Sequence, residues 1–214
     1  MNQTAHFITD KNFLKAVQDH LKIEHLPTFE EVASIDVLLA DNYEIKSIEG
    51  AQYFTSAIEL DFHDNQISDL TPLASLTQLQ RLELGNNPIE DITPLANLMN
   101  LYRLAIGFNY KTDSLEPLAK LVNLKQLFVC SNQLTDIRPL KALTKLEWVK
   151  LCNNKITDLS VLKELPHLKF ADVSCNAFNP EEIKNKETIL HLQKQGSYKN
   201  NEDFFVASVS KRLV

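Results

Sequence analysis

The sequence predicts an α/β fold, a right-handed solenoid in which short parallel strands and short helical turns repeat along one axis. Three observations predict it: a similar segment recurs about every 22 residues, alternating apolar positions mark one short strand per copy, and an asparagine follows that strand in six of seven copies. The copies begin at Ile35, Ala57, Leu79, Leu101, Leu124, Leu146 and Leu168. Stacked copies of this kind bury one continuous apolar core.

Each copy follows the pattern LxxLxLxxNxIxDLxPLxxLxx, as in LQRLELGNNPIEDITPLANLMN. Successive side chains of a strand point to opposite faces, so Leu82 and Leu84 should face the core while Arg81 and Glu83 face solvent. The asparagine that follows carries both donors and an acceptor, which the backbone of a buried turn needs. We therefore expect a structural ladder at Asn65, Asn87, Asn109, Asn132, Asn154 and Asn176.

The return half of each copy carries an aspartate shortly before a proline. An aspartate oxygen caps a first helical turn and proline suits its start, so we expect short helical or 3₁₀ segments there. The residues concerned are Asp69, Asp91, Asp136 and Asp158, with Pro72, Pro94 and Pro139. The copy from Leu101 has one extra residue between Asn109 and Pro117, which we place in the loop, outside the stacked core.

These motifs resemble the leucine-rich repeats of the bacterial internalin family, in the 22-residue, SDS22-like class, over about residues 35–178. The resemblance implies a leucine-rich-repeat solenoid with a concave parallel sheet, a convex side of 3₁₀ or short helices, and helical caps at both ends. Surface internalins add a secretion signal, an Ig-like domain and a wall anchor, and we expect none of these here.

Three parts follow: an N-terminal helical cap over 1–34, the repeats over 35–178, and a C-terminal cap helix with a tail over 179–214. In the first part, Asp10 should begin a helix, and Thr28 with Glu31 should form a capping box for a second one.

The composition and charge of the chain exclude several classes of function. The 214 residues carry a net charge of -6, which offers no general attraction to nucleic acid, and no apolar run is long enough for membrane insertion. The 4 glycines form no phosphate-binding loop, and the 6 histidines form no HExxH motif and no ligand pattern with the cysteines. We therefore expect no enzymatic activity, no cofactor and no metal. We also expect the protein to be cytoplasmic, or to be exported without a Sec signal.

The three cysteines are Cys130, Cys152 and Cys175. Their spacing matches no disulfide scaffold, which favours reduced thiols, so we expect three free thiols in protein prepared with reductant. Cys130 and Cys152 occupy equivalent places in adjacent copies, where small residues fill a crowded strand end; a disulfide between them is the alternative.

Two patches on the outward strand face are candidate partner contacts. The first is aromatic and consists of Phe108, Phe128, Trp148 and Phe170, with Lys150 beside Asp172. Exposed aromatic residues are enriched at interface hot spots. They could instead cover one another or pack under the C-terminal tail.

The second patch is acidic, with Asp61 next to Glu83 and Asp64 nearby. Adjacent like charges cost stability, which a basic partner or a bound cation would offset. The alternative is a solvated acidic face.

The expected function is therefore binding of a protein partner, whose identity the repeat does not specify, on the concave face. The alternatives are a regulatory subunit of an enzyme such as a phosphatase, as the SDS22-like repeat implies, and an effector exported without a leader.

Overall fold

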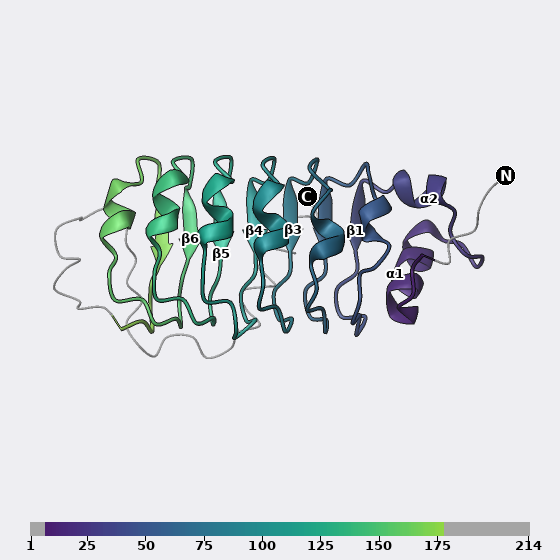
Figure 1. Ribbon diagram of the computed structural model, residues 1–214, viewed down its shortest axis with the longest axis horizontal. Helices are drawn as coiled ribbons and strands as arrows, with labels where there is room; N and C mark the ends of the chain where they lie inside the picture. Colours follow the sequence, from purple (N-terminus) through teal and green to yellow (C-terminus); the bar gives the residue numbers. More distant parts are fainter. Residues whose placement is uncertain (1–6, 178–214) are drawn as a thin grey trace, which may run out of the picture.

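The structure, a computed structural model, describes residues 7–177 as a solenoid with one parallel seven-stranded sheet (Figure 1). Each strand pairs with the strand of the next repeat, in the order β1 to β7. The strands are β1 (Val37–Leu39), β2 (Glu59–Asp61), β3 (Arg81–Glu83), β4 (Arg103–Ala105), β5 (Gln126–Phe128), β6 (Trp148–Lys150) and β7 (Phe170–Asp172). The predicted repeat solenoid is confirmed. The predicted cap helix and tail over 179–214 lie outside the described residues.

Six 3₁₀ helices stack as a second layer over one face of the sheet (Figure 1). They are η1 (Ala51–Tyr53), η2 (Thr71–Leu73), η3 (Thr93–Asn97), η4 (Glu116–Lys120), η5 (Arg138–Ala142) and η6 (Ser160–Glu164). The predicted aspartates lie one residue before the N-cap position, and each accepts from the N–H of the first 3₁₀ residue: Asp69 Oδ1, for example, accepts a hydrogen bond from the Thr71 N–H at 2.8 Å. The leucines between the two layers form the core.

Helix α1 (Lys11–Leu21) lies at the β1 end of the sheet (Figure 1). It begins at Asp10, as predicted, whose Oδ1 accepts from the N–H groups of Asn12 and Phe13. The second carboxylate oxygen of Asp10 accepts from two N–H groups of the first coil, at Lys46 and Ser47, so the cap also ties the helix to the solenoid. The hydrogen bonds to Phe13, Lys46, Ser47 and Asn12 outweigh the effect of burial and lower the pKa of Asp10.

Helix α2 (Phe29–Ala33) begins with the predicted capping box of Thr28 and Glu31. The Thr28 hydroxyl accepts from the Glu31 N–H, and the Glu31 carboxylate accepts from the Thr28 N–H at 2.7 Å. Among the described residues, no helix has both the length and the apolar character needed to cross a membrane.

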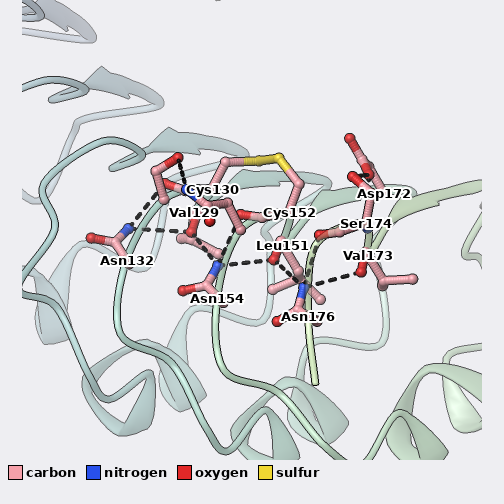
Figure 2. Close-up of a disulfide and its surroundings, with 12 residues drawn as sticks. Val129, Cys130, Asn132, Leu151, Cys152, Asn154, Asp172, Val173, Ser174 and Asn176 are labelled. Atoms are coloured by element: carbon pink, nitrogen blue, oxygen red, sulfur yellow. Dashed lines mark hydrogen bonds between the residues drawn. A yellow bond between two sulfur atoms is a disulfide. The ribbon is translucent and has the colours of Figure 1, made fainter. Parts of the chain in front are cut away.

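The predicted asparagine ladder is confirmed, and Asn87 shows how it works. Its Nδ2 donates to the carbonyls of Phe62, Leu84 and Gly85, while its Oδ1 accepts from the Ile67 N–H at 2.9 Å. One buried amide thus joins two consecutive coils. Figure 2 shows the same donation to backbone carbonyls by Asn132, Asn154 and Asn176.

The ladder differs at the coil that follows the longer loop between Asn109 and Pro117. Asn154 Oδ1 accepts from the Leu134 N–H of the preceding coil at 3.1 Å. The corresponding oxygen of Asn132, the first ladder residue after the longer loop, is buried and has no hydrogen-bond partner among the described residues. β4 and η4 keep their usual lengths, so the loop absorbs the insertion at the expense of one hydrogen bond.

Replacing the ladder asparagine in Asn87→Ala should lower the free energy of unfolding by about 3 kcal/mol or more, because each buried polar group left unpaired costs roughly 1–3 kcal/mol. Denaturant unfolding followed by circular dichroism measures the change. The matched control is Asn97→Ala, since Asn97 is exposed on η3. Equal stability of the two variants would contradict the ladder's role.

Candidate functional site

The strand register lines up equivalent residues of successive repeats into columns on the face of the sheet opposite the core, here called the sheet face. One column consists of Val37, Glu59, Arg81, Arg103, Gln126, Trp148 and Phe170, and the next consists of Leu39, Asp61, Glu83, Ala105, Phe128, Lys150 and Asp172. Residues that are 22 or 23 positions apart in the sequence are therefore direct neighbours on this surface.

The C-terminal half of the sheet face carries an aromatic patch of Phe128, Trp148 and Phe170. Trp148 and Phe170 stack with their ring centroids 5.3 Å apart, and 43% of Trp148 remains exposed. The guanidinium of Arg103 lies 4.6 Å from the Phe128 ring centroid. The structure thus stacks two of the predicted aromatic residues, Trp148 and Phe170, while Phe128 lies on the adjacent strand β5 against Arg103, and Trp148 is the most exposed of the three.

Lys150 borders the aromatic patch. Its Nζ lies 5.9 Å from the Phe170 ring centroid, and its Cα pairs with that of Asp172 in the strand register. Burial lowers the pKa of Lys150 to about 8, and Arg103 adds to the effect while Asp172 opposes it. Asp172 is buried, and its Oδ1 accepts hydrogen bonds from the N–H and the hydroxyl of Ser174. Asp172 therefore also holds the turn after β7, in addition to lying beside Lys150.

Phe108 occupies a turn just after β4, with a positive φ of 60°. Asn42, Asp64, Asn86 and Asn153 take the same conformation at the equivalent place in other coils, with φ between 55° and 58°. Asparagine and aspartate tolerate this left-handed region, whereas a bulky side chain there is uncommon. Phe108 is half-buried, and its position is set by the turn rather than by the strand columns.

Glu83, predicted to belong to an acidic surface patch, is 6% exposed and lies in a charged network. Its Oε1 accepts from Arg103 Nε at 2.5 Å and lies 3.8 Å from Arg81, which also approaches Glu59 at 3.7 Å. Burial raises the pKa of Glu83 and Asp61 adds to this, although Arg103 and Arg81 oppose it. The alternative of a solvated acidic face is therefore wrong for Glu83, which pairs within the chain.

Asp61 is 8% exposed and lies beside His63, which the sequence interpretation did not select. Asp61 Oδ1 is 2.6 Å from His63 Nδ1. Asp64 is more exposed, and its Oδ1 accepts from Asn86 Nδ2 at 2.7 Å. Although burial opposes it, the hydrogen bond to Asp61 and the charges of Asp61, Asp41 and Asp64 raise the pKa of His63.

A disulfide joins Cys130 to Cys152, so the alternative for this pair holds and the expectation of reduced thiols there is wrong (Figure 2). Each cysteine lies two residues beyond the end of its strand, β5 or β6, and the parallel register holds the two Cα atoms 4.6 Å apart. Cys175 is an exposed free thiol. The bond links two turns whose carbonyls also accept from the ladder amides of Asn132 and Asn154 (Figure 2).

Comparison with known proteins agrees with this architecture. A family model described as "Leucine Rich repeats (2 copies)" matches residues 58–97, 77–120 and 122–164. A search of curated proteins finds no match. Among solved structures, internalin C2 from Listeria monocytogenes is 34% identical with a TM-score of 0.76, and the alignment covers 81% of this chain and 77% of that one.

The chain belongs to the internalin-like leucine-rich-repeat proteins. Internalin F from the same bacterium is also similar, with 25% identity, a TM-score of 0.55, and coverage of 83% of this chain and 73% of that one. A leucine-rich-repeat protein from Leptospira interrogans shares the fold at 17% identity and a TM-score of 0.59, over 72% of this chain and 46% of that one.

In this internalin-like protein, Arg103→Ala should lower the free energy of unfolding at pH 7.5 by about 3 kcal/mol, because removing one partner leaves the buried Glu83 carboxylate poorly compensated. A carboxyl group with a raised pKa binds its proton more tightly in the folded state. As the pH falls toward 4.5, the usual pKa of glutamate, Glu83 takes up a proton and loses its charge. The difference in free energy of unfolding between Arg103→Ala and the parent should therefore become smaller. Denaturant titrations at several pH values measure both effects.

The double variant Arg103→Ala/Glu83→Gln is the control, because it removes the charge together with its partner. It should recover most of the stability at pH 7.5. A double variant as unstable as Arg103→Ala would show that Arg103 acts through packing on Phe128 rather than through Glu83.

Proposed function

We propose that this chain is a non-enzymatic protein-binding module that docks its partner on the sheet face, through the aromatic patch with Phe108 and Lys150 at its margin. The observation that carries the proposal is Trp148, a large side chain that is 43% exposed on a rigid sheet and supported from one side by Phe170. A partner can bury this ring with little loss of side-chain entropy, because the stacking already restrains it.

The fold supports a binding role in general terms. Leucine-rich-repeat proteins present an extended sheet surface whose residues vary while the repeat framework is kept. One solved structure with the same fold is the Arabidopsis receptor kinase HAESA in complex with a peptide hormone and a co-receptor, at 23% identity and a TM-score of 0.54, over 59% of this chain and 23% of that one. That complex supports protein or peptide ligands as a class.

The charges of the sheet face favour its aromatic end as the contact. Glu83 is held by Arg103 and Asp61 by His63, so these two predicted acidic contacts already have partners within the chain. Lys150 is half-buried, and its pKa near 8 reflects a cation that lacks full solvation. A partner carboxylate placed beside Lys150 would stabilise its charged form, which adds an electrostatic contribution to the apolar contact.

Truncation in Trp148→Ala should weaken partner binding by about 2 kcal/mol or more, the range typical of an interface hot spot. The immobilised full chain captures candidates from a lysate, and the affinity of a captured partner is then measured for both proteins. Val122→Ala is the matched control, because it shortens an exposed apolar side chain between η4 and β5.

The melting temperature of Trp148→Ala separates the alternatives. Unchanged affinity with a lower melting temperature would mean that Trp148 packs within the chain, for example under the C-terminal tail. Recovery of a phosphatase catalytic subunit that binds with the same dependence on Trp148 would favour the regulatory alternative.

We further propose that the protein works in an oxidising compartment, and this proposal rests on the Cys130–Cys152 disulfide.

Alkylation of thiols in intact native cells should reveal one free thiol per chain, that of Cys175. Reduction should lower the free energy of unfolding by about 3 kcal/mol, the typical effect of opening a loop of this length. Cys175→Ser is the control: it retains the Cys130–Cys152 disulfide, so reduction should lower its free energy of unfolding by the same amount, and alkylation should reveal no free thiol. Three trapped thiols would favour the cytoplasm.

A further inference from the structure

The sheet face has two zones of different chemistry, and one segment near the C-terminal end of the sequence carries groups that complement both. We propose that residues 202–212 of the same chain bind along the sheet face and compete there with the protein partner. The binding of this segment stands by itself, whereas the competition rests on the proposed function. Residues 202–212 lie outside the described part of the chain.

The aromatic patch and Lys150 form the first zone, over β5 to β7. Trp148 is 43% exposed there and stacks on Phe170, and Lys150 is half-buried at the margin. The second zone lies at the other end of the sheet, in the turns after β1 and β2, where the side chains of Asp41 and Asp64 are 46% and 42% exposed. An aromatic segment with an acidic flank fits the first zone, and a basic segment fits the second.

Residues 202–212 read EDFFVASVSKR, which supplies these groups in the matching order. Two acidic residues come first, two phenylalanines follow, and a Lys-Arg pair comes last. The residues between, 206–210, carry no charge, and they would cross β3 and β4, where Glu83 is already paired with Arg103. Burial of the two phenylalanine rings against the aromatic patch removes apolar surface from water, which favours the contact.

The spacing along the segment agrees with the spacing of the two zones. Adjacent strands lie about 4.8 Å apart, so β5 and β2 are separated by roughly 14 Å. Phe205 and Lys211 are six positions apart, and an extended chain rises about 3.3 Å per residue, which gives a reach of about 20 Å. The connection from Ala177, at the β7 end, to Glu202 has about 25 residues, which is enough to return to the neighbouring strand β6.

The covalent connection favours the chain's own segment over that of a second copy. A segment of the same chain is present at an effective concentration of about millimolar order, whereas a second copy must associate at the concentration of the protein itself. The net charge of -6 also makes two copies repel each other. The contact can therefore be too weak to join two molecules and still be occupied within one.

The single tryptophan of the chain, Trp148, provides the test, because its fluorescence reports on the aromatic patch alone. The measurement compares the parent chain with the full-length variant Phe204→Ser/Phe205→Ser. We expect the emission of the variant to shift to longer wavelength and acrylamide to quench it more strongly, because the indole ring loses apolar cover. Identical emission and quenching in the two proteins would overturn the proposal.

Charge variants test the second zone. Lys211→Glu/Arg212→Glu should shift the emission in the same direction, and Asp41→Lys added to that variant should reverse the shift, since Asp41 is largely exposed and the charges are then exchanged. Lys194→Glu/Lys199→Glu makes the same change of charge nearer the repeats and is the matched control, with the emission of the parent. A shift as large in the control, or no reversal by Asp41→Lys, would overturn the assignment of the basic end to this zone.

Concentration and partner affinity separate the remaining outcomes. Quenching that falls as the protein concentration rises, together with a dimer in sedimentation, would assign the sheet face to a second copy and overturn the proposal. If the segment covers the patch about nine-tenths of the time, a partner should bind Phe204→Ser/Phe205→Ser about 10-fold more tightly than the parent. Equal affinity with altered fluorescence would overturn the competition. Unchanged partner affinity in Trp148→Ala would instead count against the proposed function, because the fluorescence comparison needs no partner.

Discussion

Hydrogen bonding of the buried turn after each strand is the constraint on which the rest of the structure depends. Every coil must reverse direction inside the stack, where its backbone N–H and C=O groups are cut off from water. The asparagine amide satisfies groups of its own coil and of the coil before it, as Asn87 does for Leu84 and Ile67. Because these bonds cross between coils, they set the spacing of the coils as well as the shape of each turn.

That spacing creates the functional surface. A strand of three residues presents only two outward side chains, but in-register pairing of seven strands lines up each outward position into a continuous column. The columns place arginines beside glutamates at one end and aromatic rings beside one another at the other. The same close register brings Cys130 and Cys152 into bonding distance. Neighbours on this surface are consequently one repeat apart in the sequence.

Much of the site could be predicted by stacking the repeats on paper. The contact of Trp148 with Phe170 and the proximity of Asp61 to Glu83 both follow from the period of 22 residues. Burial could not be predicted in this way, because an outward position near the middle of a packed sheet is covered by its neighbours' long side chains. Glu83 is the example: Arg103 and Arg81 lie across it.

The sequence by itself determined the repeat, the parallel sheet, the caps at Asp10 and Thr28, and the columns of the sheet face, because each depends on local periodicity or on a motif of a few residues. Only the tertiary structure decided the side-chain states that depend on distances between repeats. The folded chain joins Cys130 and Cys152 in a disulfide and buries Glu83, and within residues 7–177 Asn132 Oδ1 has no hydrogen-bond partner. A difference of a few ångströms between adjacent coils determines each of these outcomes, and a linear pattern carries no such distances.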